Sequence, residues 1–138
     1  MEKSIIANGF FEIPHTADAS LVVFGSTKEE LFINSAKGMY HIMGITYKDK
    51  PEKRLELKLA EHDLESLLVS FLSELLYFSE NLSMVRDIDL TIDNGQLSGI
   101  LVAVPIFDSK IEIKAITFNN LKIDQHDNIY KTKIVFDI

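Results

Sequence analysis

The stretch DLESLLVSFLSELLYF, from Asp63 to Phe78, decides the fold because it carries one long apolar stripe. Its apolar residues recur every three or four positions, which is the period of an α-helix. The stripe consists of Leu64, Leu67, Leu68, Phe71, Leu72, Leu75 and Leu76. Asp63 stands just before it, where an aspartate commonly caps the first turn of a helix. Such a stripe must be buried against another apolar surface, and we expect a β-sheet to provide it.

Another helix is predicted upstream, between a capping sequence and a glycine. The segment Ser26-Thr27-Lys28-Glu29-Glu30 offers two hydroxyl groups, each followed three residues later by a glutamate, as in a capping box. Apolar residues then recur with helical spacing as far as Met43. Gly44 follows, and glycine is the residue type that most often ends a helix.

Most other segments alternate apolar and polar residues, as half-buried strands do. The pair Asn94-Gly95 between two of them is a strong hairpin signal, because both residues tolerate positive φ. We therefore predict an α+β protein of two layers, in which both helices pack on one face of a mixed, mostly antiparallel sheet of about seven short strands. The expected strands are residues 10–16, 19–24, 54–59, 85–92, 97–104, 111–118 and 129–136, with a short piece around 121–123.

Length and charge restrict the organisation and the partners of the chain. Its 138 residues fit one domain, residues 1–138, and its 14 basic and 21 acidic side chains give a formal net charge of −7. Strong direct binding to nucleic acid is not expected, because phosphate contacts need clustered Lys and Arg. A basic groove that binds nucleic acid would have to form on a protein whose overall charge is negative.

Three absences in the sequence also exclude classes of site and location. There is no cysteine, which excludes disulfides, a thiolate nucleophile and cysteine-ligated metals. The most apolar window, residues 64–78, is interrupted by polar side chains and is too short to span a bilayer. The first residues lack the long apolar run of a signal peptide. We therefore expect a cytoplasmic protein without a membrane partner.

Carboxylates occur in two places that could carry chemistry. The bend His15-Thr16-Ala17-Asp18 contains side chains that often bond to nearby backbone, so ordinary turn chemistry explains it equally well. Asp137 lies beside the α-carboxylate of Ile138, and these groups repel each other unless a cation or a donor compensates them. The ordinary interpretation of the second place is a solvated chain end. Neither feature establishes a function by itself.

Lys114 is the third candidate, in the segment EIKAITF of residues 112–118. In a strand it shares a face with Ile116 and Phe118, so its charge would lie among apolar neighbours. Ordinarily such a lysine lays its stem along the sheet and extends its ammonium group to water.

Taken together, four segments resemble the archease family, small proteins that assist the 3′-phosphate RNA ligase of tRNA splicing. These segments contain the HTAD bend, the start of the DLESLL helix, the EIKAITF strand and the final Asp-Ile. The resemblance covers nearly the whole chain and is weakest at residues 48–54 and 85–107. The segments are FFEIPHTADASLVVFGSTKEELFINSAKGMYHIM (10–43), AEHDLESLLVSFLSELLYF (60–78), EIKAITFNNLKI (112–123) and VFDI (135–138).

The resemblance implies an accessory protein of the ligase and not an enzyme. Archeases promote guanylylation of the ligase, let it turn over repeatedly and broaden its choice of nucleotide. The resemblance also implies a divalent-cation site made by Asp18, Asp137 and Ile138, with calcium as the first expectation and magnesium or manganese as alternatives. Oxygen ligands of this kind suit a hard cation. The functional lysine of the family corresponds to Lys114, which would meet phosphate or a ligase carboxylate, and His15 is expected to stabilise its bend rather than bind the metal.

The sequence departs from many archeases at two places. Asn119 and Asn120 stand where many members have a histidine after the EIKAITF strand, so a second imidazole is not expected near Lys114. Tyr130 stands where many have a tryptophan, which is a conservative change for packing.

Two other classes of function stay open. A metal-dependent hydrolase would use carboxylates, a cation and a lysine to activate water, although the sequence shows no nucleophile–base pair, histidine pair or phosphate loop. A chaperone-like binding module would use an exposed apolar patch and would be indifferent to Asp18 and Asp137.

Overall fold

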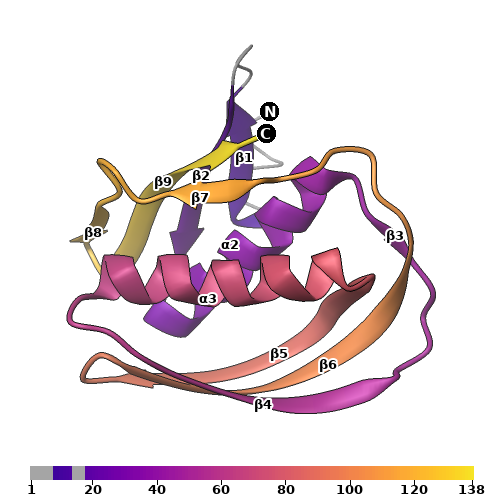
Figure 1. The fold of residues 1–138 in the computed structure, drawn as a ribbon. Coiled ribbons are helices and arrows are strands. Elements are labelled where there is room, and N and C mark those ends of the chain that lie inside the picture. The colour runs from indigo at the N-terminus through magenta and orange to yellow at the C-terminus, as the bar shows by residue number, and fades with distance from the viewer. Residues whose placement is uncertain (1–7, 14–17) are drawn as a thin grey trace.

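A computed structural model describes residues 8–13 and 18–138, and in it the helices lie between two sheets (Figure 1). The helices of the described chain are α2 (Lys28–Met43) and α3 (Leu64–Glu80). Neither is long and apolar enough to cross a membrane. The strands are β1 (Phe10–Ile13), β2 (Asp18–Gly25), β3 (Thr46–Tyr47), β4 (Lys53–Ala60), β5 (Ser83–Asp93), β6 (Gln96–Asp108), β7 (Ala115–Thr117), β8 (Ile123–His126) and β9 (Ile129–Asp137).

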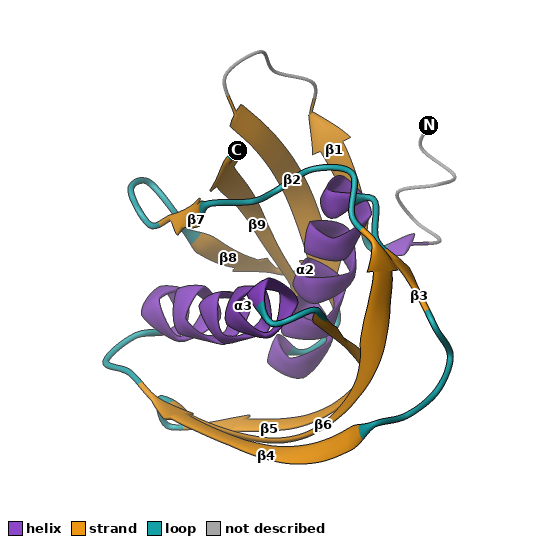
Figure 2. Ribbon diagram, turned by 45° about the vertical axis from the view of Figure 1, so that its right-hand side comes forward, coloured by secondary structure: helices purple, strands orange, loops and turns teal. Residues whose placement is uncertain are grey.

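The α+β class and the antiparallel pairing are confirmed, but the strands form two sheets where we expected one. In the five-stranded sheet the order is β1-β2-β9-β7, and β8 also pairs with β9. In the four-stranded sheet, β3, β4 and β5 all pair with the long strand β6. Figure 2 shows that the second sheet curves beneath the helices while the first covers them from above.

The reason for two sheets lies in the helices, which are buried on more than one side. On α2 the buried residues span about 200° of the helix circumference, from Gly38 through Leu31 and Phe32 to Tyr40. A helix that is buried over more than half of its circumference needs apolar partners on more than one side. One sheet can cover only one side, so a second sheet must close the other.

Both helices begin, and α2 ends, as the sequence predicts. The Thr27 hydroxyl accepts a hydrogen bond from the Glu30 N–H at 3.0 Å, and the Glu30 carboxylate accepts from the backbone N–H and hydroxyl of Ser26. Gly44 ends α2 in the left-handed conformation, with φ 61°. Asp63 accepts from the Ser66 N–H at 2.7 Å, and this bond lowers the pKa of the Asp63 carboxyl. The predicted hairpin is also present, with Asn94 and Gly95 at positive φ.

The exposed edge of β5 is bound to α2 by side-chain acceptors. The Tyr40 hydroxyl accepts from the Val85 N–H at 3.1 Å, and the Glu29 carboxylate accepts from the Ile92 N–H at 3.0 Å. Burial raises the pKa of Tyr40 to about 12. These bonds satisfy two donors on an edge strand and fix the four-stranded sheet against the helical layer.

The Tyr40–Val85 bond gives a first prediction about stability. Tyr40→Phe should lower the free energy of unfolding by about 1–3 kcal/mol, because the Val85 N–H loses its acceptor in a buried place. Urea unfolding measures this change. Tyr77→Phe is the matched control, since Tyr77 is 59% exposed, and it should change stability by less than about 0.5 kcal/mol. Equal stability of the two variants would contradict the role of this bond.

The same group predicts a dependence on alkaline pH. The pKa of Tyr40 is about 12 in the fold against 10.0 ordinarily, so folding favours the protonated hydroxyl. This contribution is complete below the ordinary value and is lost as pH rises through the folded value. The stability of the unmodified protein relative to Tyr40→Phe should therefore decrease between about pH 10 and pH 12.

Candidate functional site

Two carboxylates face each other at one end of the five-stranded sheet. Asp18 is the first residue of β2, Asp137 is the last residue of β9, and the antiparallel register places them directly opposite each other. Opposite residues of such a pair have Cα atoms about 4.5–5.5 Å apart. Their neighbours Ala19 and Phe136 belong to the buried core, so alternation directs both aspartates to the face away from the helices.

This placement puts two acidic side chains side by side at one end of the sheet. Asp137 is exposed and Asp18 is half-buried. Like charges directly opposite each other in a sheet repel, and the repulsion falls when a cation or a donor lies between them. The two carboxylate side chains that were predicted to bind a metal are therefore neighbours in the described structure.

The structure brings Lys114 and Ile138 to the same place. The Lys114 N–H donates a hydrogen bond to the Asp137 carbonyl at 2.7 Å, next to the pairing of Ala115 with Asp137. The side chain of Ile138 packs against the core, which holds its main chain at the end of the sheet. Four predicted site residues, from three separate parts of the sequence, therefore lie at one end of β9.

The surroundings of Lys114 differ from the strand face we expected. The strand β7 begins only at Ala115, and the Lys114 side chain is exposed while Ile113 and Ile116 are buried. The segment before β7 is held by the end of α2, because the Met43 carbonyl accepts from the Lys110 N–H at 2.8 Å. The segment is thus a fixed connection and not a strand, so the ammonium group of Lys114 reaches water.

His15 lies outside the described residues, together with the rest of the bend at 14–17. The described histidines lie elsewhere. His41 has its ring 5.5 Å from that of Phe10, and His126 is the last residue of β8.

The donor set at the end of the sheet suits a hard divalent cation. Over residues 8–13 and 18–138 there is no group of three or more His, Cys, Asp and Glu side chains that could hold a metal ion. The predicted set has two such side chains, Asp18 and Asp137, and takes its third ligand from the main chain of Ile138. Carboxylate and main-chain oxygens are the ligands that calcium, magnesium and manganese prefer. The residues present therefore fit a cation that keeps open coordination positions.

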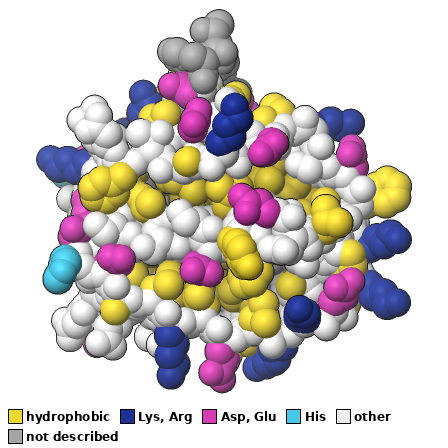
Figure 3. Space-filling model, viewed as in Figure 1, with side chains coloured by type: hydrophobic (Ala, Val, Ile, Leu, Met, Phe, Trp, Pro, Cys, Tyr) yellow, Lys and Arg dark blue, Asp and Glu magenta, His cyan; other side chains and the backbone are white. Residues whose placement is uncertain are grey.

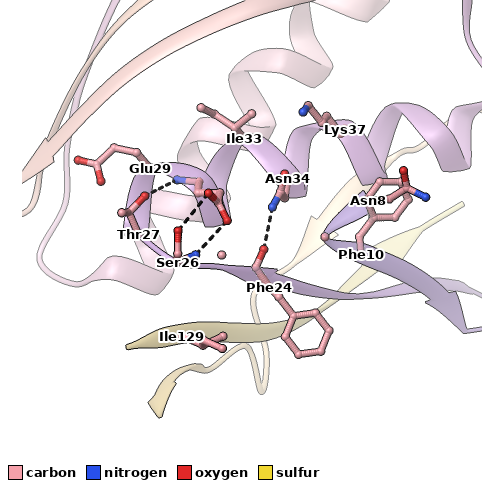
Figure 4. Close-up of a pocket in the computed structure, with 13 residues that line it drawn as sticks. Asn8, Phe10, Phe24, Ser26, Thr27, Glu29, Ile33, Asn34, Lys37 and Ile129 are labelled. Carbon is pink, nitrogen blue, oxygen red and sulfur yellow. Dashed lines mark hydrogen bonds between the residues drawn. The ribbon is translucent and has the colours of Figure 1, made fainter. Parts of the chain in front are cut away.

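A groove at the start of α2 was not indicated by any sequence motif (Figure 4). It has a volume of about 890 Å³, and Phe24 and Ile129 are among the residues that line it. Its polar groups are largely engaged within the fold, since the Asn34 amide donates to the Phe24 carbonyl at 2.8 Å and Glu30 is bound to Ser26. Phe24 lies six residues along β2 from Asp18, so the groove is about 20 Å from the carboxylate pair.

Comparisons with known proteins were made by sequence and by structure. The model of the Archease protein family matches residues 10–138. The protein archease of Methanosarcina barkeri is 37% identical over 91% of this chain and 93% of its own length. That of Thermococcus kodakarensis is 35% identical over 80% of this chain and 84% of its own length.

Two solved structures share the fold. The crystal structure of an archease from Thermotoga maritima superposes with a TM-score of 0.71 at 23% identity, covering 91% of this chain and 94% of its own. The solution structure of a Methanobacterium thermoautotrophicum protein also gives a TM-score of 0.71, at 26% identity, covering 95% of this chain and 99% of its own.

Proposed function

Because the chain belongs to the archease family, we propose that it is an accessory protein of the 3′-phosphate RNA ligase of tRNA splicing and not itself an enzyme. In this role it promotes guanylylation of the ligase and lets the ligase turn over repeatedly. The observation that carries the proposal is the pairing of Asp18 with Asp137 at the end of the sheet, beside Lys114.

Asp18, Asp137 and the main-chain oxygen of Ile138 would hold one divalent cation, with calcium as the first candidate and magnesium or manganese as alternatives. When bound, the cation would neutralise the carboxylate pair and offer open positions to oxygen atoms of the ligase or its nucleotide. Sheet pairing fixes the backbone of both aspartates, so their relative position needs little reorganisation. This arrangement suits a protein that completes a site on another protein.

Lys114 and His15 are proposed to contact the partner. The main chain of Lys114 is fixed by its bond to Asp137, while its ammonium group is exposed. A lysine held in this way presents a mobile positive charge beside a negative pair. It could meet a phosphate or a carboxylate of the ligase while the cation site meets another group.

The proposal predicts the loss of ligase stimulation in carboxylate variants. Asp18→Ala and Asp137→Ala should each reduce stimulation at least about tenfold, because each removes a charged ligand of the cation. The assay measures ligase turnover with this chain well below the ligase concentration, with and without a chelator. Asp89→Ala is the control, since Asp89 is exposed on the other sheet and should leave stimulation unchanged. Full stimulation by the Asp18→Ala/Asp137→Ala double variant would refute the cation site.

Cation binding should also raise thermal stability without any ligase present. A ligand that binds only the folded state stabilises it by about 2.7 kcal/mol at one hundred times its dissociation constant. Thermal unfolding with calcium, magnesium and manganese would measure the effect for each ion. The Asp137→Asn variant should lose the cation-induced rise in unfolding temperature, and the Asp89→Asn variant should keep it. An equal shift in both variants would show that the cation binds elsewhere.

A chaperone-like binding module is the second candidate, favoured by exposed apolar side chains. Phe107 is 73% exposed and Leu82 is 70% exposed. The Ile106 N–H bonds to the Leu82 carbonyl, so the two side chains lie in the same region. Such a module would protect unrelated proteins from aggregation even when Asp18 and Asp137 are replaced. Aggregation assays with the double variant therefore separate this function from the ligase role.

A further inference from the structure

The five-stranded sheet has an outer face on which none of the described elements packs. Both helices lie on its other side (Figures 1 and 2). Along β2, Leu21 and Val23 belong to the core, and alternation turns Ser20, Val22 and Phe24 outward. The cross-strand partners of these outward residues on β9 are Val135, Lys133 and Lys131. We call this surface the open sheet face, and its described members are Phe11, Ile13, Ser20, Val22, Phe24, Lys131, Lys133 and Val135.

One half of the open sheet face is aromatic. Phe11 and Phe24 are half-buried, with ring centroids 6.5 Å apart on neighbouring strands. Figure 4 shows the Phe24 ring directed away from α2, on the same side of the sheet as Ile129. Ile129 is 49% exposed. The rings are thus held by the sheet backbone and accessible from solvent.

The other half of the open sheet face is cationic. Lys131 and Lys133 are exposed and successive on the outer side of β9, and the Lys131 ammonium lies 5.6 Å from the centre of the Phe24 ring. Lys122 precedes β8 on the same side, where it lies 3.7 Å from Asp124. Asp124 is opposite Lys131 in the register of the two strands. The three lysines on this part of the sheet are thus accompanied by one aspartate.

This cationic half is unusual for a chain with a net charge of −7. On the face shown in Figure 3, by contrast, acidic and basic side chains are interspersed. Further carboxylates near this half are Glu65, which accepts from the Ile123 N–H at 3.0 Å, Asp127 in the hairpin and the Asp18–Asp137 pair. Lys133 is four residues from Asp137 on β9, which is about 13 Å along an extended strand.

We propose that the open sheet face binds a single-stranded polynucleotide. Lys131, Lys133 and Lys122 would meet its phosphates, and the Phe11 and Phe24 rings would stack on its bases. The pairing of cations with rings favours this occupant over an acidic peptide, which would need the cations alone. Few phosphate contacts are available, so the binding is weak and sensitive to salt, which agrees with the expectation that strong nucleic-acid binding is absent.

The experiment measures fluorescence anisotropy of a labelled oligouridylate of about 12 nucleotides, with an oligothymidylate of the same length as a second arm. A chelator is present and no ligase is added, so the outcome does not depend on the cation site or on the proposed function. The logarithm of the affinity should fall with the logarithm of salt with a slope of about −1.4 to −2.1, for two to three phosphate contacts. Equal binding in both arms indicates a stacking and phosphate surface, and preference for the RNA arm indicates contact with the 2′-hydroxyl.

Two lysine pairs provide matched variants. Lys131→Gln/Lys133→Gln should weaken binding about tenfold or more at low salt and reduce the slope by about 1.4. Lys53→Gln/Lys58→Gln removes the same charge from exposed lysines of the other sheet and should bind within about twofold of the unmodified protein. Equal losses in the two variants would mean that net charge alone governs binding, and would overturn the proposal.

Stacking is tested separately, with a probe that has phosphates and no bases. Phe24→Leu keeps an apolar side chain and should weaken oligonucleotide binding about fivefold or more, while inorganic polyphosphate binds as before. Phe11→Leu is a second variant in case the first impairs folding. Absence of oligonucleotide binding by the unmodified protein at about 20 mM salt would overturn the proposal. It would also be overturned if the lysine variant lost ligase stimulation but kept polynucleotide binding, because the face would then meet a protein.

Discussion

The structure depends on the burial of two helices on both of their sides. Phe32 of α2 and Phe71 of α3 are fully buried with ring centroids 5.6 Å apart, at the centre of the helical layer. Apolar residues of both sheets close on this layer, among them Leu21 and Ile134 from one sheet and Leu101 from the other. Neither sheet alone could remove the helices from water, so each sheet is needed for the stability of the other.

This arrangement leaves the outer faces and ends of the sheets free to carry function. Along β9, Thr132, Ile134 and Phe136 are buried against the helical layer, while the alternate residues face outward. The period of two therefore places core and surface on one strand without conflict. The carboxylate pair lies where β2 and β9 meet at the end of the sheet, so its backbone geometry is set by the same ladder that buries the core.

The features that could be predicted from sequence are those determined by a few neighbouring residues. Thr27, Gly44 and Asp63 were identified as helix ends, and Asn94-Gly95 as a hairpin, because each effect is local. Division into two sheets depends on which strands pair over long distances, and the apolar pattern of a single strand does not specify its partner. The strand predicted at residues 111–118 is shorter in the structure, because a hydrogen bond to Met43 holds the segment before β7. Asp18 and Asp137 were named as a pair through family resemblance, whereas their exact register required the fold.

The open sheet face and the carboxylate pair act on each other electrostatically, since they share β2 and β9. Phosphates drawn to Lys131 and Lys133 would be repelled by Asp18 and Asp137 at the other end of the same strands. A divalent cation between the aspartates would cancel that repulsion and let the bound strand extend to the end of the sheet. In such an arrangement the cation would determine how far the polynucleotide extends along the sheet. The same pairing register that fixes the two carboxylates therefore links the proposed cation site to the proposed polynucleotide surface.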